Sequence, residues 1–103
     1  MPSRRRVNVA KVIRTPAVVR DLAAITDWIA NDNLDAALRF YDEADRVLGL
    51  IARYPMLGEA MDHLAPGLRR HMLGEHLLFY RLIGDQIELI RVLHGARDID
   101  SQL

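Results

Sequence analysis

The apolar residues in the first half of the chain recur at the spacing of two helices. Thr15-Pro16 is a favoured helix start, and the apolar positions behind it follow at intervals of four, three and four, on one helical face: Val18, Leu22, Ile25 and Ile29. Asn31-Asp32-Asn33 interrupts the pattern. A second apolar stripe then predicts a helix from Leu34 to about Tyr54, which Pro55 ends. The short connection predicts an antiparallel pair, and we expect Trp28 to take part in its packing.

The second half of the chain changes to a period of two, which is typical of strands. Three such segments, at residues 68–73, 76–83 and 86–94, are separated by Gly74-Glu75 and Gly84-Asp85, and a leading glycine in a two-residue loop favours a tight hairpin. Residues 7–14 predict an earlier strand and residues 56–67 a loop. The order β-α-α-β-β-β predicts an α+β domain. Two antiparallel helices should pack on one face of a small antiparallel sheet, with the first strand beside the last.

Two-residue hairpins fix a register in which residue 73 faces 76 and residue 83 faces 86. One face then carries a mainly apolar set that we expect to pack on the helices: Leu68, Met72, Leu77, Phe79, Ile83, Ile90 and Val92. The other face carries a mixed set that two layers would leave uncovered: Arg69, His71, Leu78, Tyr80, Leu82, Ile87, Leu89, Arg91 and Leu93. An exposed apolar patch with polar groups at its rim is typical of a partner surface. The register also places Arg81 opposite Glu88, a favourable cross-strand pair.

Composition sets the broad class of protein. Half of the 103 residues are apolar, which suits one domain with a modest core, and we expect that domain at residues 9–103 behind a basic arm at residues 1–8. The absence of cysteine excludes disulfides and thiolate chemistry and agrees with a cytoplasmic protein. No apolar run is long enough to span a bilayer. The net charge is zero, but residues 1–20 hold six basic side chains and no acidic one, whereas residues 21–62 hold nine acidic and three basic ones. This segregation favours a basic strand followed by an acidic, solvated helical surface.

Several segments, taken in order, resemble one known family. They are the Thr15-Pro16-Ala17 helix start, the Asp21-Leu22 pair, PGLRRHMLGEHLLFYR at residues 66–81 and IELIRVLHGARD at residues 87–98. Together with the β-α-α-β-β-β order, they resemble the ParE branch of the RelE/ParE toxin superfamily over about residues 12–98.

The resemblance implies the toxin half of a type II toxin–antitoxin pair. ParE-like toxins are associated with binding and poisoning DNA gyrase, so the implied toxin is a binding protein rather than an enzyme. The implied partner is a ParD-like antitoxin that wraps the helices and the open sheet face in a hetero-oligomer. Membranes and direct nucleic-acid contacts are not expected. The alternative is a RelE-like, ribosome-dependent endonuclease that cuts messenger RNA.

The candidate chemistry lies on the strands. The four histidines, at positions 63, 71, 76 and 94, fit no common ligand spacing, so we expect neither a metal nor a cofactor. A metal-free ribonuclease needs a base, an acid and cations, and its candidates are His71, Tyr80, Arg91 and His94. The binding toxin needs no catalytic residue. Its expected antitoxin- or target-binding surface is Arg69, Tyr80, Leu89, Arg91, Leu93, His94 and Arg97.

Arg91 carries the sharpest of these hypotheses. In the expected register it lies on the open face, and Glu88 of the same strand points to the opposite face. A guanidinium stays charged and needs an acceptor. We therefore expect a carboxylate of the antitoxin to pair with Arg91.

Overall fold

A computed structural model describes residues 9–95, so the basic arm and Arg97 lie outside the described range. The elements are β1 (Lys11–Arg14), α1 (Pro16–Asp32), α2 (Leu34–Arg53), β2 (Glu59–Ala60), β3 (Leu68–Leu73), β4 (His76–Ile83) and β5 (Gln86–His94). The predicted order is confirmed, with β2 as a short addition inside the expected loop. Neither helix of the described part of the chain is long and apolar enough to cross a membrane.

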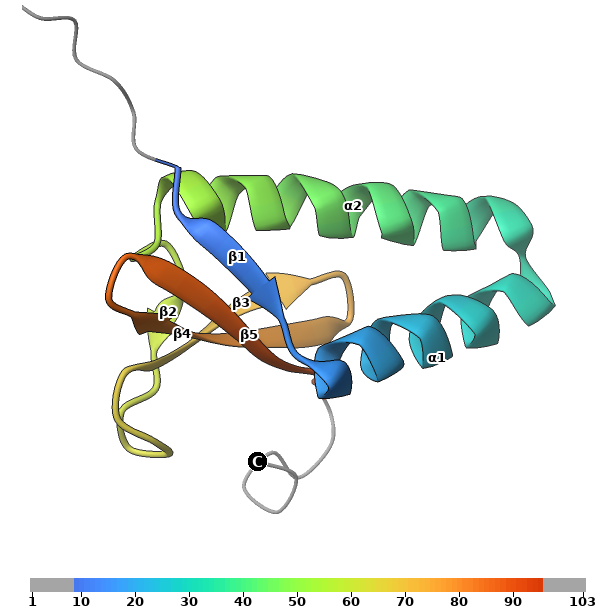
Figure 1. Ribbon diagram of the computed structural model, residues 1–103. Helices are drawn as coiled ribbons and strands as arrows, with labels where there is room; N and C mark the ends of the chain where they lie inside the picture. Colours follow the sequence, from blue (N-terminus) through green and yellow to red (C-terminus); the bar gives the residue numbers. More distant parts are fainter. Residues whose placement is uncertain (1–8, 96–103) are drawn as a thin grey trace, which may run out of the picture.

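The predicted helix boundaries are confirmed, because polar side chains cap both helices. The Thr15 hydroxyl accepts the backbone N–H of Val18 at the start of α1. Asn33 serves both helices: its N–H donates to the carbonyl of Ile29, and its side chain accepts the N–H of Ala36. One residue therefore ends α1 and begins α2, and the helices run back antiparallel with their turn projecting beyond the sheet (Figure 1).

The sheet has the strand order β1-β5-β4-β3-β2. Both hairpin registers are as predicted, since Leu73 pairs with His76 and Ile83 with Gln86. The Arg81–Glu88 pair is also confirmed, with 3.1 Å between nitrogen and oxygen. The first strand lies beside the last, but β1 runs parallel to β5. The sheet is therefore mixed rather than antiparallel throughout.

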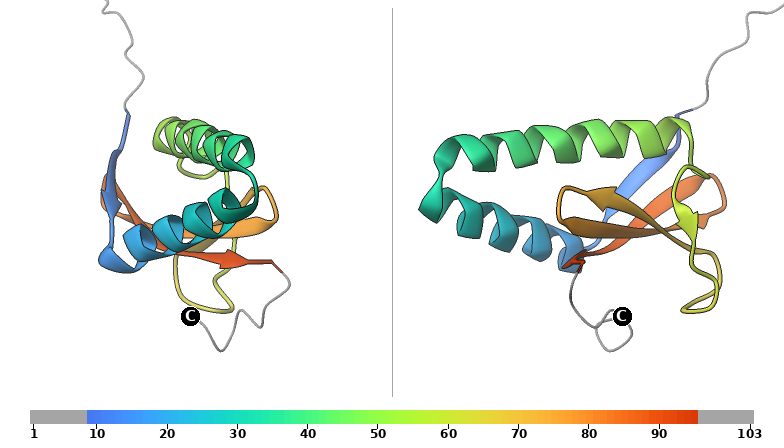
Figure 2. Two further views of the ribbon diagram at one scale, coloured as in Figure 1. Left: turned by 90° about the vertical axis from the view of Figure 1, so that its right-hand side faces the viewer. Right: turned by 180° about the vertical axis from the view of Figure 1, so that it is seen from behind.

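The prediction of which sheet face meets the helices is wrong. The main core joins Val18 of α1 and four residues of α2 to five residues of the face that was expected to be open, together with Leu73 and Val92. The five are Leu78, Tyr80, Leu82, Ile87 and Leu89. The helices cover this face (Figure 2). Val92 joins it because a register shift in the β4–β5 ladder, between Phe79 and Tyr80, moves the end of β5 by one residue.

The opposite face carries a second, smaller core. Leu68, Phe79 and Leu93 are buried there under Met61, with Leu64 and Ala65 of the same loop packed alongside. The loop between β2 and β3 therefore acts as a partial third layer. Both faces of the sheet need apolar residues for this reason, and apolar content alone could not identify the face that the helices cover.

Trp28 does not pack between the helices as expected. Its side chain is 78% exposed and is the most exposed of the large apolar residues in the described range. It lies on the last turns of α1. The turn that joins α1 to α2 projects beyond the sheet (Figure 1). A tryptophan in such a place leaves a large apolar surface available to a partner.

Candidate functional site

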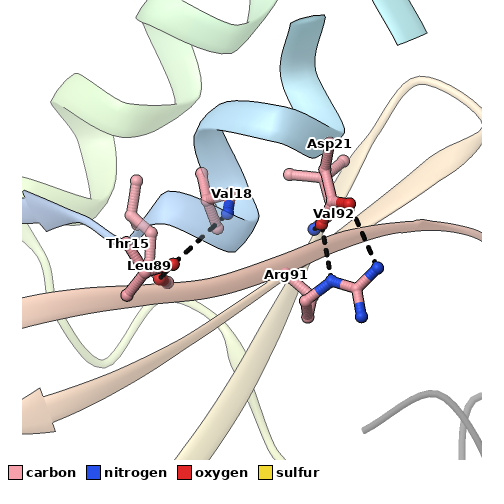
Figure 3. Close-up of polar contacts among 6 residues, drawn as sticks. All are labelled: Thr15, Val18, Asp21, Leu89, Arg91 and Val92. Carbon is pink, nitrogen blue, oxygen red and sulfur yellow. Dashed lines mark hydrogen bonds and ion pairs between the residues drawn. The ribbon is translucent and has the colours of Figure 1, made fainter. Parts of the chain in front are cut away.

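Asp21 of α1 ties the end of β5 to the helices. Its carboxylate accepts two hydrogen bonds from the Arg91 guanidinium, at 2.7 and 3.1 Å, and a third from the Val92 backbone N–H at 2.9 Å. Figure 3 shows the carboxylate facing both donors. The hydrogen bond to Asp21 is the main reason that the pKa of Arg91 is raised above its usual value. We call this contact the Asp21 clamp.

The Asp21 clamp lies along β5, just beyond the point where β1 stops pairing with it. β1 pairs with β5 as far as Leu89, whose carbonyl accepts the Thr15 hydroxyl at 2.8 Å (Figure 3). Beyond that point the carboxylate of Asp21 takes the β5 N–H that a neighbouring strand would have taken. Side chains at the start of α1 therefore satisfy backbone groups that β1 leaves at this edge.

Arg91 already pairs with an acid of its own chain, which the expected register did not provide. Its guanidinium has a chain partner in Asp21, and its side chain is about one-third exposed. The register shift also changes its place on the strand, since Arg91 faces Phe79 across the ladder instead of lying in line with Leu89. Contact between Arg91 and a carboxylate of the antitoxin stays a prediction, and such a carboxylate would share the guanidinium with Asp21.

Tyr80 is a buried anchor for the turn after α2. Its hydroxyl donates to the carbonyl of Pro55 at 2.8 Å and accepts the N–H of Gly58 at 2.7 Å. The Arg69 guanidinium donates to the carbonyls of Met56 and Gly58 in the same turn. Burial raises the pKa of Tyr80. Tyr80 and Arg69, both expected to bind a partner, therefore hold the chain's own backbone.

The residues proposed for a ribonuclease are not gathered into one site. Tyr80 is fully buried, and Arg91 is held by Asp21. His71 lies on β3, separated from β5 by Leu78 of β4, whereas His94 ends β5. Two members of the expected binding surface, Leu89 and Leu93, are also buried. Among the described residues of the expected binding surface, His94 is exposed, while Arg69 and Arg91 are half-buried.

The open surface lies instead under the projecting helical hairpin. A hollow of about 530 Å³ lies beside the Asp21 clamp, between α1 and the end of β5. It is lined by Asp21, Ala24, Ile25, Trp28, His76, Val92, Leu93 and His94. A second, of about 450 Å³, shares Trp28, His76 and His94 with it and extends to α2 and the β3–β4 turn. We call the two together the hairpin hollow. Its apolar floor and its exposed tryptophan suit a protein partner better than a small ligand.

Three aromatic rings line up in the hairpin hollow. His76 and His94 face each other across the β4–β5 ladder with their ring centroids 5.4 Å apart and nearly perpendicular. His76 also meets Phe40 of α2 edge to face, with 5.7 Å between centroids. Burial is the main cause that lowers the pKa of His76, and the neighbouring His94 lowers it further, while Glu75 acts in the opposite direction.

Sequence reasoning did not place Asp21, Trp28 or His76 in a functional site. A signal for Asp21 was present, because it lies three residues after Val18 and four before Ile25. That spacing places a carboxylate on the buried stripe of α1, where it needs a donor. No comparable signal marked Trp28, since its exposure depends on how far the helices project past the sheet.

One face of the sheet points away from the helices, and acidic residues of the same chain neutralise its arginines Arg70 and Arg81. Arg70 is paired with Glu59 at 2.9 Å and Arg81 with Glu88 at 3.1 Å. Both pairs leave little unbalanced positive charge for a phosphate backbone, which basic surfaces bind by releasing counterions. Within residues 9–95, no three histidine, aspartate or glutamate side chains come together as a metal site would require.

Comparisons with known proteins agree on the family of this chain. The family described as the ParE toxin of the type II toxin–antitoxin system, parDE, matches residues 12–99. The chain is 32% identical to Toxin ParE1 of Mycobacterium tuberculosis, across 91% of this chain and 98% of that protein. It is 29% identical to Toxin ParE3 of Caulobacter vibrioides, across 92% and 96%. The chain therefore belongs to the ParE toxin family of toxin–antitoxin systems.

Solved structures share the fold. The chromosomal ParDE toxin–antitoxin system from P. aeruginosa contains a chain that aligns with a TM-score of 0.71 and 19% identity, over 84% of this chain and 97% of that one. The toxin–antitoxin complex RelBE2 from Mycobacterium tuberculosis aligns with a TM-score of 0.59 and 24% identity, over 84% and 98%. The RelE/ParE fold expected from the sequence is confirmed.

Proposed function

We propose that this toxin acts in the cytoplasm by binding and inhibiting DNA gyrase and that a ParD-like antitoxin neutralises it. The gyrase target comes from the association of the ParE branch with this enzyme. The observation that most supports a binding toxin over a ribonuclease is the engagement of Tyr80 and Arg91 inside the chain. Neither group is placed to act on an RNA 2′-hydroxyl or on a phosphate.

The ParD-like antitoxin is supported by the family description, which names parDE, and by a surface that fits a protein partner. We propose that the antitoxin covers the hairpin hollow and packs an apolar side chain against Trp28. An exposed tryptophan at the rim of an apolar hollow has the character of an interface hot spot.

The target is tested by two assays run side by side with the purified toxin. Relaxed plasmid, gyrase and ATP report supercoiling, and a reconstituted translation mixture reports cleavage of messenger RNA. We expect supercoiling to stop, or double-strand breaks to accumulate, while the messenger RNA stays intact. Ribosome-dependent cleavage with unaffected gyrase would overturn the proposal in favour of the endonuclease.

A matched pair of variants separates a specific effect from loss of folding. His71→Gln and His94→Gln each replace one candidate acid or base with a side chain that still hydrogen-bonds. A gyrase-binding toxin should retain its inhibition of supercoiling in at least the His71→Gln form, because His71 supplies no proton in a binding mechanism. Loss of toxicity in both variants with unchanged melting temperatures would instead indicate proton-transfer chemistry.

A further inference from the structure

The two histidines of the hairpin hollow connect the sheet to the projecting helices. His76 begins β4 and His94 ends β5, so both stand at the same end of these two strands, and both line the hairpin hollow. His76 contacts His94 on one side and Phe40 of α2 on the other. Its ring is therefore a direct link between the sheet and the second helix.

We propose that His76 and His94 form a proton-operated latch. With both rings neutral, His76 holds Phe40 and the hairpin hollow keeps the width seen here. When both rings are protonated, their like charges repel at 5.4 Å and His76 needs water, so its contact with Phe40 is released and the hollow widens beside Trp28.

Among residues 9–95, the charged groups that line the hollow act in both directions. Glu75, on the β3–β4 turn, favours a protonated His76 but is outweighed by burial and by His94. α2 contributes both Arg39 and Glu43 to the hollow, which carry opposite charges. α1 contributes Asp21, whose carboxylate is engaged by Arg91 and Val92.

The neighbouring strand β3 adds a third histidine to this region. His71 lies close enough to Glu43 for its positive form to favour the ionised carboxylate. The latch is carried by the two rings that contact each other, His76 on β4 and His94 on β5.

The single tryptophan of the chain reports on the latch directly. Trp28 lines the same hollow as both rings, so its fluorescence should change between pH 8 and pH 5, with a midpoint below the ordinary histidine value of about 6.5. His76→Gln should abolish the change. His94→Gln should reduce the size of the change, because the repulsion between the two rings is lost. His63→Gln, at an exposed position in the loop on the other sheet face, should leave the curve as it is.

A second measurement needs no variant and decides the case if a substitution disturbs folding. NMR titration of the wild-type chain follows the His76, His94 and Phe40 ring protons together. The latch requires the Phe40 resonances to shift in the same pH range as His76, with coupled titration of the two histidines. Phe40 and Trp28 signals that stay constant while His76 titrates, or two histidines that titrate independently, would overturn the proposal.

Discussion

Asp21 and Arg91 are 70 positions apart in the sequence and are joined by two hydrogen bonds of 2.7 and 3.1 Å. The same carboxylate accepts the Val92 N–H, so one side chain holds both the backbone and the side chain of β5. The clamp acts where β1 no longer covers the edge of β5. It thereby fixes the strand end that carries His94 relative to the helix that carries Trp28.

Asp21→Asn should lower the free energy of unfolding by about 1.5–3 kcal/mol, the range for hydrogen bonds to a charged group. The asparagine amide has the shape of the carboxylate, but it is neutral and only one of its two polar atoms accepts hydrogen bonds. It therefore cannot accept from all three N–H donors of Arg91 and Val92. Chemical denaturation gives the value. Glu43→Gln is the matched control, because it removes a carboxylate from the exposed Glu43–Arg46 pair and should leave the denaturation midpoint nearly unchanged. Equal effects of the two substitutions would contradict the clamp.

Tyr80→Phe should destabilise the protein by about 1–3 kcal/mol, because it leaves the Gly58 N–H and the Pro55 carbonyl without their hydroxyl partner. The ring itself and its packing are retained. Tyr41→Phe is the control, since the Tyr41 side chain is more than half exposed. Thermal melts of the two variants should differ clearly, and a Tyr80→Phe melt equal to that of the wild type would contradict the anchoring role.

Gly58→Ala should be destabilising by about 1–3 kcal/mol, because the added methyl carbon would lie 2.6 Å from the Tyr80 hydroxyl oxygen and 2.8 Å from the Arg70 carbonyl oxygen. Neither neighbour can move without breaking the turn or the sheet. Gly49→Ala makes the same chemical change in α2, where no atom lies within 4 Å. It should stabilise by about 0.5–1 kcal/mol, as expected for alanine in a helix interior. Opposite signs in denaturant titrations are the expected result.

The local features of the fold were predictable because they depend on neighbours in the sequence. Thr15 and Asn33 cap helices through residues three positions away, and the glycines at 74 and 84 both adopt the positive φ that tight hairpin turns require. The ladder register followed from those turns. These interactions need no knowledge of the tertiary arrangement.

The arrangement of the layers was not predictable in the same way. Leu78 and Phe79 are both buried, one under the helices and the other under the loop that carries Met61. A strand that is buried on both faces shows no alternation of apolar and polar residues. Its sequence therefore does not indicate which face the helices cover. The register shift near Phe79 then changed the side on which Arg91 and Val92 lie. The expected binding surface was built on this face assignment, so its residues lie in other surroundings than expected.

The free energy of unfolding should decrease as the pH is lowered below about 6.5. The pKa of His76 is lowered in the folded chain, mainly by burial, so the unfolded chain binds a proton at a higher pH than the folded chain does. The contribution of His76 to stability is therefore complete above its pKa in the unfolded chain, about 6.5. It is lost as the pH falls toward and through its lower pKa in the folded chain. Urea titrations at pH 7.5 and pH 5.5 should show a smaller pH dependence for His76→Gln than for the wild type. An identical dependence would contradict the shift.

Trp28→Ala should weaken antitoxin binding at least ten-fold while leaving the toxin folded. Its side chain is 78% exposed, so truncation removes little from the core. An interface tryptophan buried by a partner typically contributes more than about 1.4 kcal/mol, which corresponds to a ten-fold change in affinity.

Tyr54→Ala is the matched control for Trp28→Ala, because Tyr54 is an aromatic residue, 55% exposed, at the opposite end of the helical hairpin. Titration calorimetry of each variant against the cognate antitoxin gives the affinities, and circular dichroism checks the fold. If the antitoxin covers the hairpin hollow, the Trp28 variant loses affinity and the Tyr54 variant retains it. The reverse order would move the partner to the other end of the helices, where Tyr54 and Met56 are exposed. Equal, undiminished affinities would exclude both ends as the principal contact.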